Sequence, residues 1–337
     1  MADLNELNNK VKEAEKKANS SINKNNKEKY SFDFDELRMY FGDPYDVVLD
    51  DGKIIRIKQP TIGDMLEFGE QKIYNTIMPF TTNTTAYRLQ LWDMGIDWNT
   101  ISNFELFIMF ANGLKKEDTD LIFQGIEYYL NPNYNEELSE EENYKNGQMK
   151  YLQATWDIDF QKLKPYMRPK VDENGEVILN ENDEPEQELV LYSYDEDNND
   201  EFLLDEKTYM HIHEYLCALF DQYTKEEFTK GKTAKEWIID EERRKQAKLK
   251  NEKNQGKSFL LPLVSGLVNH PGFKYKTSEL RELGIYQFMD SVRRLQVYEQ
   301  CTAFLKGMYS GMMDTSKMGD AERAESINWL KDLHSKS

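Results

Sequence analysis

The sequence predicts a predominantly helical α+β protein. We expect an N-terminal β-hairpin followed by helices, an acidic insertion with a small β element, and a C-terminal helical bundle. Three observations support this fold class. Two β-rich runs flank a turn segment near residue 50, apolar residues recur at helical spacing in the last third of the chain, and most of the negative charge falls in one central span.

Length and composition limit the possible functions. The chain has 337 residues, 39% of them hydrophobic, which is enough apolar material for roughly two domains. Its formal net charge of −19 repels nucleic-acid phosphates and anionic lipid head groups. The two cysteines are too few for a disulfide scaffold, and the sequence shows neither a signal peptide nor an apolar run of 18 residues. We therefore expect a cytosolic protein that binds neither nucleic acid nor membrane directly.

The N-terminal part is predicted to hold a polar arm and one α+β domain. Residues 1–29 are rich in Lys, Asn, Glu and Ser and are expected to form a flexible arm. The β-rich runs 47–49 and 54–57 flank the turn segment 50–53, which predicts a hairpin. We assign residues 30–132 to the N-terminal domain.

Capping signals mark the predicted helices of this domain. Thr61 with Asp64 begins a helix that should continue to about residue 78, and Ser102 with Glu105 begins another that should reach about residue 114. A further helix is expected at about 119–129. These helices should pack on the hairpin.

The acidic span follows this domain. Between residues 136 and 201 there are 20 acidic and 6 basic residues, which gives −14 of the chain's −19. Short strands are expected at 171–179, around the turn Asn174-Gly175, and at 188–192. We interpret residues 133–201 as an exposed acidic insertion with a small β element. The plainer alternative is a solvated loop without a function of its own.

The last third of the chain is predicted to be helical. Helices are expected at about 209–220 and 234–251, and a further apolar run begins at residue 259 and ends at a Pro/Gly stop near residue 271. We assign residues 202–312 to a C-terminal helical domain and 313–337 to a polar tail.

The longest amphipathic run spans residues 280–308, and Gly311 ends it. Such a stripe is most often core, with a cofactor or peptide groove as the alternative. Its apolar members are Ile285, Met289, Val292, Leu295, Tyr298, Cys301, Leu305 and Met308.

Motifs for nucleotide binding fail on spacing. The strings GKT at 231–233 and GKS at 256–258 resemble the end of a phosphate-binding loop. That loop needs a glycine five residues before its second glycine, and these positions hold Glu226 and Asn251. The dinucleotide fingerprint GxGxxG is also absent from the sequence.

Metal and catalytic motifs are no better supported. His213 and Cys217 can share one helix face, whereas His211 points away from them, and two ligands do not make a metal site. The acidic runs lack the glycine and glutamate of an EF-hand, and the sequence has no GxSxG elbow. We expect a protein without enzymatic activity, bound metal or cofactor.

Four segments carry a resemblance to a known class of proteins. They are 54–68 (IIRIKQPTIGDMLEF), 284–294 (GIYQFMDSVRR), 307–311 (GMYSG) and 328–332 (NWLKD). The first is similar to the opening of bacteriophage tail assembly chaperones and related tail-module proteins. In those proteins a hairpin precedes a helix that starts with Pro-Thr-hydrophobic-Gly-Asp. The other three resemble the helical end of similar proteins from phages of Gram-positive hosts.

This resemblance implies a non-enzymatic assembly factor in the host cytoplasm that binds the tape-measure protein while the tail tube forms around it. Such chaperones are commonly much shorter than this chain. Two other classes stay open, a virion structural component such as a tail or neck protein, and an acidic inhibitor that mimics nucleic acid. Persistence in purified particles would indicate the structural component, and carboxylates on one rigid face would indicate the mimic.

The hypothesis of a protein partner suggests which side chains would contact it. Aromatic residues contribute disproportionately to interfaces, so the aromatic residues of the two helical regions are the candidate anchors. Core packing is the alternative role for each of them. The candidates are Phe68, Phe107, Tyr286 and Phe288.

Overall fold

The computed structural model describes most of residues 32–333. Within this range it leaves out 50–52, 125–128, 131–133, 136, 140–141, 144–145, 147–150, 154–157, 172–176, 181, 196–199, 252–256 and 317. The predicted polar arm 1–29 and the turn residues 50–52 lie outside the described residues. What is described is a mixed α+β fold dominated by helix, as the sequence predicts.

The predicted N-terminal hairpin is confirmed. Strands β1 (Tyr45–Val48) and β2 (Ile54–Ile57) pair antiparallel, with Tyr45 opposite Ile57. A third strand, β3 (Phe123–Gln124), pairs with the other edge of β2. The predicted helix over 119–129 is therefore wrong. Its apolar residues Ile122 and Phe123 are buried, because they complete this sheet and its core instead of one face of a helix.

The predicted helix after Thr61 is two helices. α3 (Ile62–Phe68) begins with the predicted capping box, in which the Thr61 hydroxyl and the Asp64 carboxylate each accept the other residue's backbone amide. The helix ends at Gly69, whose φ of +88° only glycine adopts without strain. Gly69 then precedes α4 (Glu70–Thr81), so the chain changes direction where a continuous helix was expected.

Short helices complete the N-terminal part. α6 begins with the predicted capping box of Ser102 and Glu105. The three other short helices, which lack long apolar stripes, were not predicted from the sequence. The helices are α2 (Glu36–Tyr40), α5 (Arg88–Asp93), α6 (Asn103–Ala111) and α7 (Lys116–Thr119).

The acidic span contains more regular structure than predicted. The strand predicted at 188–192 is present as β7 (Gln187–Asp195). It lies between β6 (Lys164–Pro169) and β8 (Asp200–Leu204) in a three-stranded antiparallel sheet. Residues 171 and 177 are bridged, as are 179 and 185, while the predicted turn Asn174-Gly175 lies outside the described residues. Two short strands, β4 (Tyr129–Leu130) just before the span and β5 (Tyr151–Gln153) within it, pair with each other, and a 3-10 turn (Phe160–Lys162) precedes β6.

This sheet is part of the main core. Within the span, Phe160, Leu163 and Leu191 are at most 2% exposed and belong to the same apolar cluster as the hairpin and α4, and Phe202 and Leu204 of the adjoining β8 belong to it too. The predicted view of the span as an exposed, solvated insertion is therefore wrong for its ordered strands, although Tyr166 and Tyr194 do face solvent. Alternation along the strands places one face on the core.

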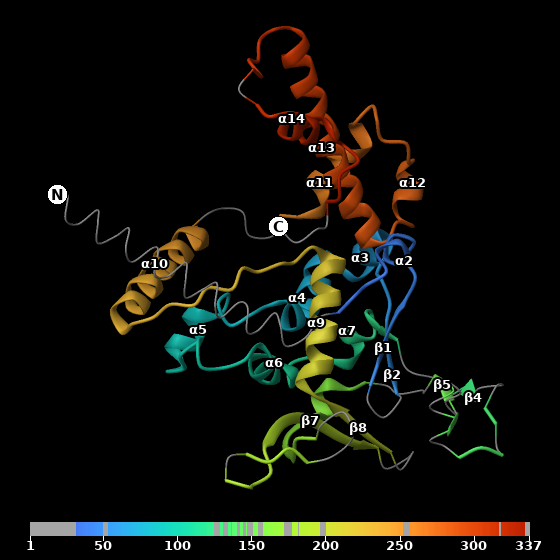
Figure 1. Cartoon of the computed structure of the whole chain (residues 1–337), viewed down its shortest axis with the longest axis vertical. Helices are drawn as coiled ribbons and strands as arrows, with labels where there is room; N and C mark the ends of the chain where they lie inside the picture. The colour runs from blue at the N-terminus through green and yellow to red at the C-terminus, as the bar shows by residue number, and fades with distance from the viewer. Residues whose placement is uncertain are drawn as a thin grey trace.

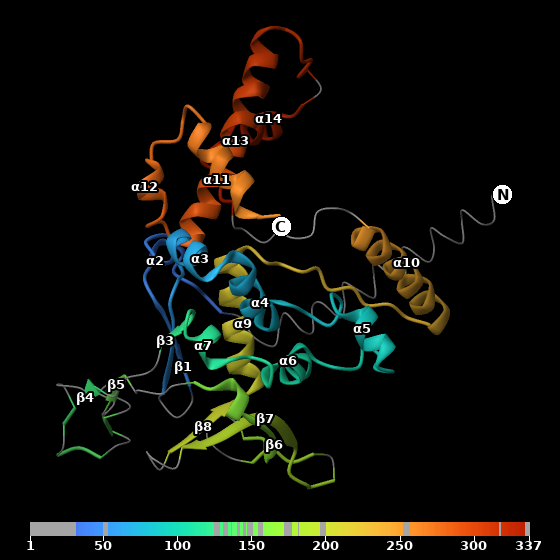
Figure 2. The same ribbon diagram turned by 180° about the vertical axis from the view of Figure 1, so that it is seen from behind.

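Helix α9 (Glu206–Phe220) runs through the middle of the molecule, as both views show (Figures 1 and 2). It packs on α4, α6, α13 and β1, so nearly every part of the fold depends on it. Asp205 caps its first turn by accepting the amide of Thr208. Its fully buried side chains are Tyr209, Ile212, Tyr215, Leu216, Leu219 and Phe220.

Four of the C-terminal helices, α11 to α14, form the opposite end of the molecule from the β6-β7-β8 sheet, whereas α10 lies beside α5 (Figure 1). Gly311, with a φ of +72°, ends the long helix α13 near the predicted position. The sequence did not reveal α14. The helices are α10 (Lys232–Asn251), α11 (Leu260–Asn269), α12 (Thr277–Leu280), α13 (Ile285–Tyr309) and α14 (Asp320–Ile327).

Two general features bear on function. None of the helices in the described part of the chain combines the length and apolar character needed to cross a lipid bilayer. Cys217 and Cys301 are both buried and both free, so neither takes part in a disulfide.

Candidate interaction surface

The C-terminal segment, residues 257–333, exposes many large apolar side chains. Its helices α11 to α14 project from the body of the molecule in both views (Figures 1 and 2). Large exposed apolar side chains that gather on one part of a protein indicate a surface for another molecule. Those of the segment are Phe259, Leu261, Val268, Tyr275, Tyr298, Tyr309, Met312, Met313, Ile327, Trp329 and Leu330.

Backbone hydrogen bonds attach this segment to the N-terminal domain. Thr61 and Gly284 form an antiparallel bridge at the start of α3 and of α13. The Ile62 amide donates to the Leu283 carbonyl at 2.9 Å, and the Gly63 amide donates to the Arg281 carbonyl at 2.8 Å. The orphan amides of the first turn of α3 thus find partners in the chain just before α13.

The buried side chain of Gln59 reinforces this attachment. Its Nε2 donates to the Met39 carbonyl at 2.8 Å, and its Oε1 accepts the Tyr286 amide at 3.2 Å. A Cβ atom at Gly284 would lie 1.9 Å from this Oε1. Gly284 is therefore required for the approach of Gln59 to α13.

A carboxylate from the body caps α11. Glu70, the first residue of α4, accepts the amides of Phe259 and Leu260, each at 2.9 Å, and the hydroxyl of Ser258 at 3.1 Å. A negative charge at this end also complements the helix dipole. One side chain thus fixes the start of α11 relative to the start of α4.

The end of the segment folds back along α13. The Arg294 guanidinium donates to the carbonyls of Trp329 at 3.0 Å and Lys331 at 2.8 Å. The Trp329 ring meets the Tyr298 ring edge-on, with centroids 5.7 Å apart. None of the residues of α14 itself is buried, so the contacts of Arg294 and Tyr298 with the residues after α14 hold this end of the segment against α13.

The four candidate anchors lie in different environments. Phe107 and Phe288 are fully buried and Tyr286 is 4% exposed, so these three have the core-packing role given above as the alternative. Phe68 is 43% exposed at the end of α3, where a partner can reach it. Of the four, the structure brings only Tyr286 and Phe288 onto one helix.

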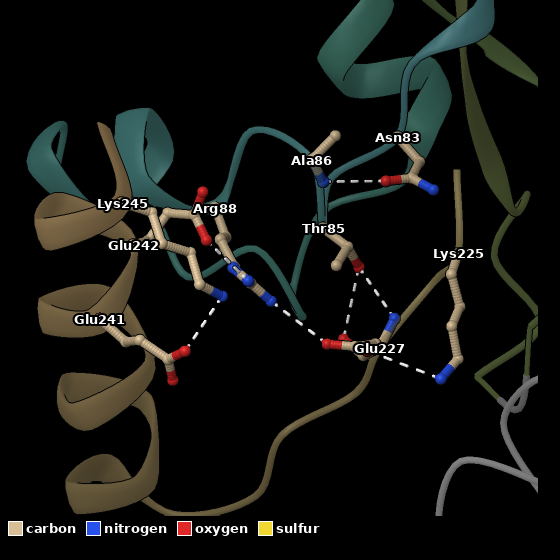
Figure 3. Close-up of polar contacts among 9 residues, drawn as sticks. All are labelled: Asn83, Thr85, Ala86, Arg88, Lys225, Glu227, Glu241, Glu242 and Lys245. Carbon is tan, nitrogen blue, oxygen red and sulfur yellow. Dashed lines mark hydrogen bonds and ion pairs between the residues drawn. The ribbon is translucent and has the colours of Figure 1, made fainter. Parts of the chain in front are cut away.

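A second ordered network holds α10 against the body (Figure 3). Arg88 donates to Glu227 at 3.3 Å and to Glu242 at 2.9 Å, and it thereby links α5 to the chain before α10 and to α10 itself. Thr85 accepts the Glu227 amide at 3.0 Å. Lys245 pairs with Glu241 within α10, and this ion pair is more exposed than the Arg88–Glu242 pair.

Side-chain amides continue this network along residues 221–231. Asn83 donates to the Thr224 carbonyl at 2.8 Å, and Asn99 donates to the Thr229 carbonyl at 2.7 Å. Ile239 of α10, 1% exposed, joins a small apolar cluster with Trp98. These contacts explain why the segment before α10 is ordered although it forms neither helix nor strand.

His211 lies in an aromatic cluster beside the hairpin. Its ring stacks on Phe32 with centroids 4.2 Å apart, and its Nε2 is hydrogen-bonded to the Tyr45 hydroxyl at 2.6 Å. Burial, together with the positive charge of Lys207, lowers the pKa of His211 from 6.5 to about 4. The imidazole is therefore neutral at pH 7.

Of the residues considered for metal or nucleotide binding, the structure describes His211, His213, Cys217 and Gly231, whereas Gly256 lies outside the described residues. His213 and Cys217 do share one face of α9, with Nε2 and Sγ 3.8 Å apart, while His213 Nδ1 donates to the Phe80 carbonyl at 2.7 Å. Within the described residues, no three His, Cys, Asp or Glu side chains converge as metal ligands. Gly231 precedes α10 after a segment without strand, unlike the glycine of a phosphate loop.

Sequence reasoning missed the exposed residues of the C-terminal segment. The apolar side chains of α11 span a wide stripe, whereas Ser265, Gly266 and Asn269 lie on the other side of the helix. The stripe is wider than the core covers, because Leu261 is 65% exposed. Its width was the signal in the sequence that pointed to exposed apolar residues in this segment.

Comparison with known proteins gives one finding. Residues 250–334 match a family model described as the YomV second domain, a domain of phage type. This range contains α11 to α14. Comparisons with the curated proteins and with the solved structures found no match.

Proposed function

We propose that this protein is a non-enzymatic phage tail assembly factor that binds the tape-measure protein in the host cytoplasm while the tail tube forms. One observation carries the proposal. The part of the chain that matches a phage-type domain is also the part that projects from the body and exposes large apolar side chains.

The physical argument rests on what a tape-measure protein needs before the tube covers it. A long helical chain that exposes apolar stripes is prone to aggregate, and a partner can mask such stripes with its own apolar surface. The net charge of −19 on this chain would keep the complex soluble. Both properties are required of a chaperone.

Co-expression with the tape-measure protein of the same phage, followed by affinity capture of this chain, tests the proposal. We expect a soluble complex and expect the tape-measure protein to precipitate when expressed alone. Capture of this chain without the tape-measure protein would contradict the proposal.

Mass spectrometry of purified phage particles separates this function from that of a virion structural component. An assembly factor should be absent from particles but present in the infected cell. Stoichiometric amounts in the particle would indicate a tail or neck protein instead.

A further inference from the structure

One side of helix α10 is fixed to the body of the molecule. Ile239 on this side is 1% exposed. Glu242 pairs with Arg88 (Figure 3), and Lys235 pairs with Asp97. At 3.6 residues per turn, these three residues of α10 lie within about 60° of one another around the helix axis. This side of α10 is therefore closed to another molecule.

The opposite side of α10 carries three side chains that the chain itself leaves uncovered. Trp237 is 66% exposed, and Arg244 and Lys248 are exposed as well. These residues are 7 and 11 positions after Trp237, which places all three within about 40° around the axis. Neither basic side chain forms an ion pair in the part of the chain that the structure describes, whereas the neighbouring Lys245 pairs with Glu241. We call Trp237, Arg244 and Lys248 the basic stripe.

The local charge at this end of α10 is opposite to that of the whole protein. Residues 243–257 contain seven basic residues and one acidic residue, a net charge of +6 in a chain that carries −19. At physiological salt, charges farther away than about 8 Å are largely screened. The field at the basic stripe is therefore set by its own cations, and it favours a partner that presents carboxylates.

The same chain presents a surface of the opposite kind between β6 and β7. Residues 171–187 contain seven acidic residues and neither Lys nor Arg. The structure describes residues 177–180 and 182–187 of this stretch, where Leu179 and Pro185 form an antiparallel bridge. We call these described residues the acidic hairpin.

The acidic hairpin combines exposed aliphatic side chains with exposed carboxylates. Val177 is 47% exposed and Leu179 is 53% exposed, and residues two apart on a strand point to the same side. Asp183 and Glu184 at the tip are exposed, and neither forms an ion pair with a described residue. Aliphatic side chains beside carboxylates are complementary to an indole ring beside two cations.

We propose that the basic stripe of one copy of this chain binds the acidic hairpin of a second copy. The Trp237 ring covers the exposed aliphatic side chains, and Arg244 and Lys248 pair with the carboxylates of Asp183 and Glu184. The stripe is about 16 Å long, which is close to the length of a strand of four residues with its turn.

This contact joins two different surfaces, so each copy in a pair keeps one stripe and one hairpin free. Such a head-to-tail contact repeats, and it builds rings or open chains of copies. The inference goes beyond the proposed function, because the contact needs no tape-measure protein. Purified protein alone tests it, so its failure leaves the proposed function as it stands.

Sedimentation velocity of the full-length chain is the first test. Exposed ion pairs bind weakly, so the concentration should reach the order of 100 μM. We expect association that increases with concentration at low salt and weakens at least tenfold at high salt. A chain that stays monomeric at every concentration in low salt would overturn the proposal.

Charge reversal on each surface tests which residues meet. Arg244→Glu with Lys248→Glu should give a monomer, and so should Asp183→Lys with Glu184→Lys. When the two variants are mixed, association should return, because the reversed stripe of one pairs with the reversed hairpin of the other. Loss of folding cannot produce this recovery, and its absence would show that these surfaces do not meet.

The matched control is Lys230→Glu with Lys232→Glu, which changes the net charge by the same amount at two exposed lysines outside the stripe. It should weaken association by no more than about twofold. If this variant is as monomeric as the stripe variant, whole-molecule repulsion explains the loss and the assignment is wrong.

Trp237→Ser should weaken association at least tenfold, because it removes the apolar part of the contact. Tyr309→Ser is its control, since Tyr309 is 82% exposed on α13, outside both surfaces. Equal effects of the two substitutions would remove the indole ring from the contact.

A nucleic acid is the other occupant that an aromatic and basic stripe could take. Fluorescence anisotropy of a labelled single-stranded oligonucleotide measures this directly. Binding that Arg244→Glu with Lys248→Glu abolishes, by a wild-type chain that does not associate with itself, would overturn the proposal.

Discussion

At the scale of single residues, Gln59 and Gly284 show how closely two distant parts of the chain fit. The amide of Gln59 joins α2 to α13 through the Met39 carbonyl and the Tyr286 amide. It is 9% exposed, so its polar atoms need these partners. The absence of a side chain at Gly284 makes this arrangement possible.

Gly284→Ala should therefore destabilise the protein by about 1–3 kcal/mol, the usual cost of overpacking. Urea denaturation measures the change. Gly266→Ala is the control, because the same methyl group meets open space there and should stabilise the protein by about 0.5–1 kcal/mol. Equal effects at both positions would show that the contact with Gln59 is not tight.

The lowered pKa of His211 predicts a specific dependence on pH. The folded protein holds this group neutral down to about pH 4, whereas the unfolded chain protonates it near pH 6.5. The unfolded state therefore binds more protons between these values, and stability falls as pH falls from 6.5 to 4.

Between pH 7 and pH 4.5 the wild type should therefore lose about 1 kcal/mol more stability than His211→Gln, which has no imidazole to protonate at this position. This value is smaller than the full pKa shift would give, because the ring is only partly buried. Urea denaturation at both pH values measures the difference, and an NMR titration gives the midpoint directly. A midpoint near 6.5 would contradict the burial argument.

At the scale of elements, Glu70 couples two helices. Because its carboxylate caps α11 from the start of α4, Glu70→Gln should destabilise the protein by about 1 kcal/mol and speed hydrogen exchange of the Phe259 and Leu260 amides. Glu67→Gln, on the exposed surface of α3, is the matched control and should change neither. If the Phe259 and Leu260 amides exchange at an unchanged rate in the Glu70→Gln variant, the Glu70 carboxylate does not cap α11.

Arg88 should matter more than Lys245, although each makes ion pairs in Figure 3. The Arg88 side chain is 16% exposed and joins two elements, whereas Lys245 is 57% exposed and pairs within one helix. We expect Arg88→Met to cost about 1–2 kcal/mol and Lys245→Met less than about 0.5 kcal/mol. Urea denaturation measures both, and equal costs would contradict this ranking.

Local signals predicted several elements well. Both capping boxes, at Thr61 and at Ser102, are present, and the hairpin around residue 50 forms with the expected strands. These features depend on residues within a few positions of one another. Strand β3 was missed, because its pairing with β2 joins parts of the chain that are distant in sequence. The break at Gly69 was missed although its signal is local, because the apolar residues keep helical spacing on both sides of the glycine.

The candidate surface was harder to predict than the fold. Aromatic residues in amphipathic helices were chosen as anchors, but such residues most often fill a core, as Phe107 and Phe288 do. The sequence shows that α11 has a wide apolar stripe, but only the packing of Leu260 and Leu267 determines that Leu261 is exposed. Exposure is a property of the assembled fold.

At the scale of the whole molecule, the uneven distribution of charge along the sequence corresponds to different parts of the structure. The strands of the acidic span belong to the main core at one end of the molecule, and residues 257–278, which contain no Asp or Glu, lie in the projecting C-terminal segment at the other (Figure 1). The part of the segment that includes α11 thus carries no carboxylate of its own. Residues 253–278 also fall within the phage-type domain match.

The central claim is that residues 257–333 are the part of this protein that binds a partner. Hydrogen exchange of the full-length chain, compared with and without the co-expressed tape-measure protein, tests it most directly. We expect the partner to slow amide exchange in α11 and the rest of the C-terminal segment, with little change in β6, β7 and β8. Protection confined to the sheet or to α10, with none in the C-terminal segment, would contradict it.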